Sequence, residues 1–216
     1  MSAVIVVFGC GSALAQSVST IKDSRDDKVY KIVKVGSQTW FAENLNYAAK
    51  GSKCYGEGGV VADGWDEDGS PNNPTKLSNA EVQANCAKYG RLYDWSTAKT
   101  ACPTGWHLPS DAEWTTLVNY VGGEQTAGTK LKSSTVWTRD EEVPVGTNDY
   151  GVSALSGGYG DSDGSFFNVG DYGRWWGATE YDAIHAWRRD MYCSLELVGR
   201  YYDSKALLFS VRCVQD

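Results

Sequence analysis

Histidine is scarce in this 216-residue chain, and the catalytic motifs that depend on it are missing. His107 and His185 are the two histidines, and the sequence has no His-Glu-x-x-His zinc motif. It also has no Gly-x-x-x-x-Gly-Lys phosphate loop, no Cys-x-x-Cys pair and no cluster of Cys and His residues that would suit zinc. We therefore expect a protein that is not an enzyme, with His107 in a structural role.

Positive charge and long apolar runs are scarce as well. The chain has 20 Lys and Arg against 27 Asp and Glu, which gives a formal net charge of −7. A nucleic-acid binder needs a basic surface to neutralise phosphates, and docking on anionic lipid has the same requirement. Beyond the N-terminus no stretch approaches the 18 apolar residues of a membrane span. The sequence thus indicates no nucleic-acid partner and no membrane-spanning helix.

The N-terminus indicates export. Residues 3–8 are apolar, and small residues lead to Ala13-Leu14-Ala15, which has the form of a signal-peptide cleavage site. We expect a signal peptide over residues 1–15 and one domain over 16–216. In the alternative, Gly9-Cys10 ends a lipoprotein signal and Cys10 is lipidated. With either signal we expect the protein to be secreted or to lie on the outer cell surface, and a lipid anchor would be its only membrane contact.

Five further cysteines, namely Cys54, Cys86, Cys102, Cys193 and Cys213, stand in a chain whose export would permit disulfides. Their number is odd, so one should be unpaired, and spacing alone does not assign the pairs.

Two acidic stretches, residues 63–69 and 161–164, are calcium-like in composition. Neither supplies the full set of oxygen ligands with a distal Glu. We predict no cofactor and no metal ligands, and calcium is the one ion that the composition leaves open.

Local patterns predict helices first and strands later, which is typical of an α+β fold. Ser78 with Glu81 and Ser110 with Glu113 form capping boxes, so helices should begin there. A short helix is expected over residues 94–101, which makes two or three helices in all. The expected strands cover 29–35, 38–42, 174–179, 186–192 and 209–214. Residues 56–75, 157–160 and 161–164 are expected to be loops.

Several motifs occur together in a known family. They include Ala42-Glu43-Asn44-Leu45-Asn46-Tyr47, Tyr89-Gly90-Arg91-Leu92-Tyr93, Gly105-Trp106-His107-Leu108-Pro109-Ser110 and Phe209-Ser210-Val211-Arg212-Cys213. Over residues 23–216 the chain resembles the Fibrobacter succinogenes major paralogous domain. The resemblance implies a C-type-lectin-like fold, in which helices flank twisted, mostly antiparallel strands. It also implies the disulfides Cys54–Cys86 and Cys102–Cys213, which leave Cys193 unpaired.

Residues 175–208 are expected to carry the ligand-binding face, because Tyr, Trp and Arg dominate binding hot spots. The expected ligand-binding residues are Trp175, Trp176, Tyr181, Asp182, His185, Trp187, Arg188, Arg189, Tyr192, Arg200, Tyr201 and Tyr202. Between Tyr181 and Phe209 there is no Asn, although relatives are commonly rich in Asn there.

These observations leave three hypotheses for function. The first is a binding module for a polysaccharide or for cell-surface adhesion. The second is a retroelement-diversified scaffold that recognises a surface protein, since randomised Asn codons could give His, Asp, Tyr, Arg, Ser, Cys or Leu. The third is an enzyme of the formylglycine-generating type. That enzyme uses a reactive cysteine pair, and the resemblance leaves this chain only Cys193.

Overall fold

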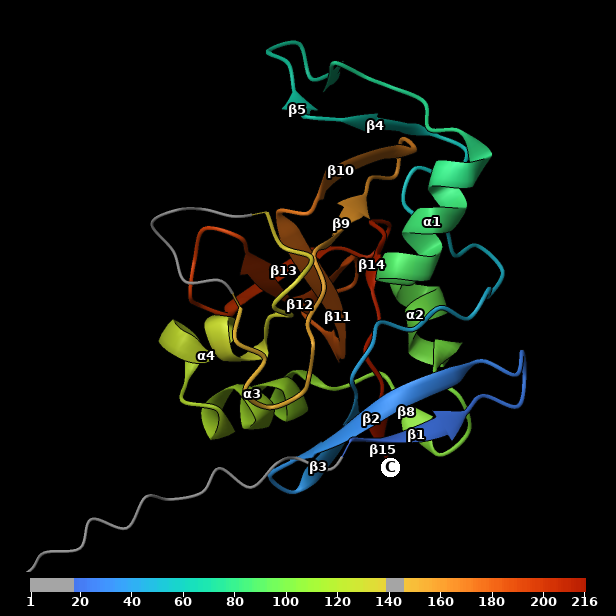
Figure 1. Cartoon of the computed structure of the whole chain (residues 1–216). Coiled ribbons are helices and arrows are strands. Elements are labelled where there is room, and N and C mark those ends of the chain that lie inside the picture. Colours follow the sequence, from blue (N-terminus) through green and yellow to red (C-terminus); the bar gives the residue numbers. More distant parts are fainter. Residues whose placement is uncertain (1–17, 139–145) are drawn as a thin grey trace, which may run out of the picture.

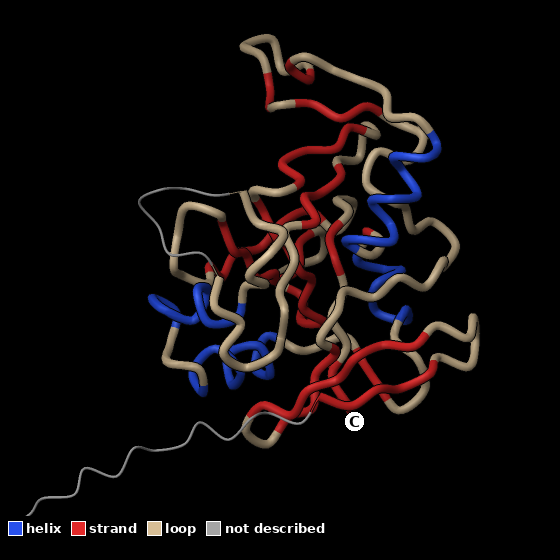
Figure 2. Tube along the Cα trace, viewed as in Figure 1, coloured by secondary structure: helices blue, strands red, loops and turns tan. Residues whose placement is uncertain are grey.

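The computed structural model describes residues 18–138 and 146–216, which form an α+β fold (Figures 1 and 2). The predicted export signal, residues 1–15 with Cys10, lies outside the described residues. The described part has four helices: α1 (Asn79–Tyr89), α2 (Trp95–Ala101), α3 (Asp111–Tyr120) and α4 (Glu124–Leu131). Figure 1 shows α1 and α2 on one side of the strands and α3 and α4 on the other. None of the described helices is long and apolar enough to cross a membrane.

One sheet has five antiparallel strands and includes both ends of the described chain. Its order is β1 (Val18–Lys22), β2 (Val29–Val35), β3 (Gln38–Phe41), β15 (Val214–Gln215) and β8 (Trp106–His107). Strand β15 is therefore inserted between β3 and β8, and Val214 is paired with Trp40 on one side and His107 on the other. The predicted hairpin over residues 29–42 is confirmed.

The second sheet has eight strands and is mixed. Its main order is β13 (Gly199–Ser204), β12 (His185–Tyr192), β11 (Tyr172–Glu180), β9 (Gly157–Gly160), β10 (Ser165–Val169) and β4 (Val60–Ala62). Strand β14 (Phe209–Ser210) joins β11 to β7 (Leu92–Tyr93). The β11–β12–β13 part is antiparallel, whereas β4 and β14 run parallel to their neighbours β10 and β11. A small separate ribbon pairs β5 (Gly64–Trp65) with β6 (Pro71–Asn72).

Both predicted capping boxes are present. Ser78 and Ser110 accept hydrogen bonds from the backbone of Glu81 and Glu113, whose carboxylates accept from the cap backbone in return. The short helix over residues 94–101 also forms, with Asp94 as its cap. These helices begin where predicted because the cap side chains satisfy backbone N–H groups that have no partner within the helix.

The fourth helix was not predicted. Helix α4 follows Gly123, whose position as N-cap provides no side-chain hydrogen bond, and it contains Gly128. That glycine is required by packing, because a Cβ atom there would lie 2.5 Å from the backbone oxygens of Glu196 and Leu197. Glycine and a missing cap both argue against a helix in sequence, so tertiary contact stabilises this one.

Several strand predictions need correction. Residues 56–75, expected to be a loop, contain β4, β5 and β6, and residues 157–160, also expected to be a loop, form β9. In β9 a Cβ atom at Gly158 would lie 2.4 Å from the backbone oxygen of Phe167, so glycine serves close strand packing there. The strand expected over 209–214 is two short strands in different sheets, and β13 was missed.

The core lies on both sides of β11. Trp175 is in a cluster with Trp40 and Trp114, whereas its neighbour Trp176 is in a second cluster with Phe209. Successive residues of a strand point to opposite faces, so one strand supplies both clusters. Burying each large side chain contributes roughly 1.5–3 kcal/mol. The indole N–H groups are also satisfied, since Trp176 donates to the Tyr93 carbonyl at 2.9 Å.

A buried polar cluster connects the two sheets. Arg212, 1% exposed, donates hydrogen bonds to the side chain of Asn44 and to the carbonyls of Phe41, Val152 and Ser153. Asn44 in turn accepts from Trp175 at 2.9 Å and donates to the Tyr89 carbonyl at 2.9 Å and to Ser210 at 3.2 Å. Burial lowers the pKa of Arg212 to about 9. These bonds join parts of the chain up to 171 positions apart.

Both disulfides implied by the resemblance are present. Cys54 pairs with Cys86 and Cys102 pairs with Cys213, with Cα–Cα distances of 5.0 and 5.9 Å. Cys193 forms no disulfide with the other described cysteines. Burial raises the pKa of its thiol, with a further contribution from Asp171. Two closed loops of this kind are typical of proteins that fold in an oxidising compartment.

Candidate functional site

The expected ligand-binding residues divide between the two faces of the β12–β13 ribbon. The antiparallel register places Trp187 opposite Tyr202 and Arg188 opposite Tyr201. Since side chains alternate along a strand, these two pairs point to opposite sides of the sheet. The sequence set therefore forms two surfaces, and we describe each separately.

The first surface, here called the aromatic face, consists of Tyr181, His185, Trp187, Arg200 and Tyr202. The rings of Tyr181 and Tyr202 are stacked with centroids 3.7 Å apart and planes 2° apart. Trp187 meets both tyrosines edge to face, at 5.2 and 5.9 Å. Both tyrosines remain 46% exposed. The face thus presents rigid aromatic rings to solvent, a geometry suited to stacking on a ligand ring.

Charged side chains fix the aromatic face in place. The Arg200 guanidinium lies 3.5 Å from the centre of the Trp187 ring and donates to Asp111 at 2.9–3.1 Å. Partial burial opposes ionisation of Asp111, but Arg200 and Arg189 hold its pKa below the usual value. Asp111 is the first residue of α3, so the helix that packs on the sheet also positions this arginine.

The rim of the aromatic face is a tight turn between β11 and β12. Asp182 accepts hydrogen bonds from the backbone of Ile184 and His185 and from the His185 ring. The His185 hydrogen bond lowers the pKa of the Asp182 carboxyl. A hydrogen bond between Tyr181 and Tyr202 raises the pKa of Tyr181. The turn is therefore ordered by its own side chains before any ligand arrives.

The second surface, here called the arginine face, lies on the opposite side of the same strands. It consists of Tyr159, Tyr172, Arg174, Arg188, Tyr192 and Tyr201. Arg188 is paired with Asp203 at 2.9 Å and with the fully buried Asp190. Its guanidinium lies 5.3 Å from the Tyr201 ring. Neither Tyr159 nor Arg174 was expected from the sequence, because no local pattern marks them and only the strand order brings them here.

Four of the expected ligand residues are buried; Arg188, 7% exposed, borders the arginine face, and the other three belong to the interior. Trp175 and Trp176 are fully buried, and Arg189 is 3% exposed. Arg189 bonds to the backbone of Asp111 and to Thr115 at the start of α3. These three side chains support the sheet and the helix contact and do not reach the surface.

Neither acidic stretch gathers metal ligands. Asp68 accepts from Ser70, and Asp63 accepts from Asn73, so these carboxylates serve their own turns. Asp163 does the same for Ser165. Within residues 18–138 and 146–216 no group of three Asp, Glu, His or Cys side chains could hold a metal ion.

Two further places carry residue types that occur in catalytic sites. Residues 160–164 have the Gly-x-Ser-x-Gly spacing, which sequence reasoning missed, but they form the turn between β9 and β10. A serine nucleophile of that motif stands on a turn from a strand into a helix. His107 lies between Asp216 at 2.6 Å and Glu113 at 2.8 Å, so both ring nitrogens are engaged. This arrangement holds β8 against α3.

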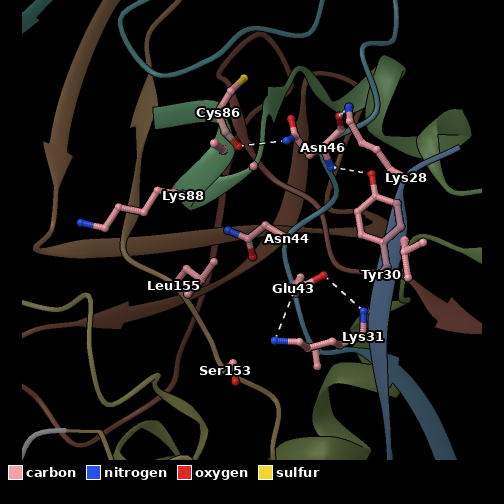
Figure 3. Close-up of a pocket in the computed structure, with 14 residues that line it drawn as sticks. Lys28, Tyr30, Lys31, Glu43, Asn44, Asn46, Cys86, Lys88, Ser153 and Leu155 are labelled. Carbon is pink, nitrogen blue, oxygen red and sulfur yellow. Dashed lines mark hydrogen bonds and ion pairs between the residues drawn. The ribbon is translucent and has the colours of Figure 1, made fainter. Parts of the chain in front are cut away.

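Two larger clefts, and a smaller one of about 300 Å³ between residues 56–59 and α1, are lined by no residue of either face, and none of them was predicted. The first, of about 440 Å³, is lined by the Asn44 motif and by Lys28, Lys31 and Lys88 (Figure 3). Two of its three lysines are already engaged, since Lys28 bonds to the Asn46 carbonyl and Lys31 pairs with Glu43. The second, of about 570 Å³, lies between α1 and β4 and is lined by Asp63, Asn168 and Asp171 among others.

These observations define a disulfide-stabilised α+β domain that displays ordered aromatic and charged side chains on the outer strands of its larger sheet. The chain belongs to the Fibrobacter succinogenes major domain family, whose profile matches residues 33–215. No curated protein and no solved structure gives a significant match to it. The resemblance found in the sequence is thereby confirmed.

Proposed function

We propose that this protein is an exported, non-enzymatic binding module with a C-type-lectin-like fold, whose aromatic face binds carbohydrate on a polysaccharide or a cell surface. The observation that carries the proposal is the stacked pair of Tyr181 and Tyr202, half exposed and fixed by Trp187. Sugar rings present apolar faces that stack on tyrosine and tryptophan rings. Because these side chains are ordered in advance, little conformational entropy is lost on binding.

Three features support the fold and the location. Strand β15 lies beside β3, so the two ends of the described chain meet in one sheet, and helices flank strands that are largely antiparallel. The two disulfides are the pairs that the family resemblance implied. Disulfides favour a secreted or outer-surface address, with lipidation of Cys10 as the alternative form of attachment. A structural role for His107 is supported because both of its ring nitrogens are engaged, by Asp216 and by Glu113.

The proposal is tested by retention of the purified domain, residues 16–216, on insoluble cellulose, on xylan and on a glycan array. Tyr202→Ala should abolish retention by removing one half of the stacked pair. Tyr120→Ala is the matched control, because Tyr120 is also exposed, at 57%, and lies on α3. Chelator should leave retention unchanged.

Two results would contradict the proposal. If wild-type protein is retained on no glycan, carbohydrate is not its ligand, and a surface protein becomes the candidate. If Tyr202→Ala and Tyr120→Ala behave alike while wild type is retained, the carbohydrate site lies elsewhere on the domain.

A further inference from the structure

Arg174, on the arginine face, has a guanidinium that is positioned but not satisfied. Its side chain is 13% exposed, and its Nε atom is buried without a hydrogen-bond partner. The closest carboxylate oxygen, on Asp190, is 3.7 Å from Nε, too far for a hydrogen bond. Among the described residues the guanidinium donates no hydrogen bond at all, although its five N–H groups are strong donors.

Aromatic rings hold this guanidinium in one place. It lies 3.9 Å from the centre of the Tyr159 ring and 5.3 Å from that of Tyr172. Rings at these distances attract a cation through their negative faces. Arg174 is therefore fixed by contacts that leave its hydrogen-bonding groups unused, an arrangement that prepares it for a ligand.

The neighbouring acids are already matched by the other arginine. Arg188 donates to both Asp190 and Asp203, and Asp190 also accepts from the Tyr192 hydroxyl at 3.1 Å. Asp190 is fully buried, so it cannot move out to meet Arg174 without breaking these bonds. The planar set of N–H donors on the Arg174 guanidinium thus remains without an acceptor, and the two oxygens of a carboxylate match the geometry of these donors.

A row of rings leads away from Arg174 across the sheet. Tyr159 lies 5.4 Å from Phe167, which lies 4.7 Å from Trp65, and Trp65 is 44% exposed. We propose that the arginine face is a second binding site, selective for a sugar acid whose carboxylate pairs with Arg174 while its ring packs beside Tyr159. A sugar acid suits the site because its carboxylate and its sugar ring are adjacent, as are the Arg174 guanidinium and the Tyr159 ring on the arginine face.

This site is independent of the aromatic face, since the two lie on opposite sides of β12 and β13. The probe is trigalacturonate, compared by titration calorimetry with its trimethyl ester, which keeps the rings and loses the charge. Wild type should bind the acid at least tenfold more tightly than the ester. Added salt should weaken the binding, because the pair is charged and partly exposed.

Two variants separate the possible explanations. Arg174→Lys keeps the positive charge beside Asp190 but removes the planar fork, and it should weaken binding of the acid at least tenfold while the fold is retained. Tyr202→Ala, on the aromatic face, should leave this binding unchanged, so failure here is distinguishable from failure of the carbohydrate proposal.

The proposal is overturned if wild type does not bind trigalacturonate, if it binds acid and ester equally, or if Arg174→Lys binds the acid like wild type. It is also overturned if triglutamate binds as tightly as trigalacturonate, because the face would then recognise a carboxylate without its sugar ring.

Discussion

Replacing Arg212 with methionine should lower the free energy of unfolding by about 3–5 kcal/mol, because the change leaves buried carbonyl oxygens without their hydrogen-bond donor. The side chain makes four hydrogen bonds, to Asn44, Phe41, Val152 and Ser153. Each of the three carbonyls left without a donor costs about 1–3 kcal/mol, or roughly 3–9 kcal/mol together. Burial of the guanidinium costs several kcal/mol of hydration that methionine does not lose, and this difference offsets part of the cost of the substitution.

The measurement is equilibrium unfolding in urea with both disulfides intact, comparing wild type, Arg212→Met, Asn44→Ala and the double variant. Because Asn44 shares a bond with Arg212, the two changes should couple by about 0.5–3 kcal/mol rather than add. Lys34→Met is the control, since this exposed side chain on β2 should change stability by no more than about 0.5 kcal/mol. A cost below about 1 kcal/mol for Arg212→Met would refute the view that this cluster joins the two sheets.

Three more predictions concern the fold. Replacing both Cys102 and Cys213 with Ala should lower the free energy of unfolding by about 4.8 kcal/mol, and replacing both Cys54 and Cys86 by about 3.7 kcal/mol, because the sequence separations are 111 and 32. If urea unfolding gives the reverse order, the loop-entropy argument is contradicted. Partial burial opposes protonation of His107, but Asp216 and Glu113 raise its pKa. The protonated His107 ring therefore stabilises the folded state below about pH 6.5, and this stabilisation is lost as the pH rises through the raised pKa. The free energies of unfolding at about pH 6 and about pH 8 should therefore differ less in His107→Gln than in wild type. Gly128→Ala should lower the melting temperature despite alanine's higher helix propensity, since its Cβ would meet two backbone oxygens at 2.5 Å, whereas Gly64→Ala, with open space around it, should not.

Local chemistry was sufficient to predict three of the four helices in the described part of the chain. A capping box is complete within four residues, so Ser78 and Ser110 identify two helix starts without tertiary information. Helix α4 and strand β9 were missed because their glycines are there for close contacts with distant backbone, at Glu196 and Phe167. Such contacts are properties of the folded chain and leave no local pattern.

The candidate site could be predicted as a region but not as two surfaces. Trp187 and Arg188 are neighbours in sequence, yet the pairing with Tyr202 and Tyr201 separates them onto opposite faces. A shift of one residue in that register would exchange the two faces, and composition does not fix the register. Arg174 was missed for the same reason, since its contact with Tyr159 depends on β9 lying beside β11.

The Cys102–Cys213 disulfide has a mechanical consequence. If the protein is pulled between Val18 and Asp216, tension reaches Cys102 and crosses the covalent bond to Cys213. Residues 103–212 then carry no load, and these include the aromatic face and, apart from Trp65, the row of rings beside the arginine face. A pull on the two ends of the described chain would therefore leave the aromatic face outside the covalent load path.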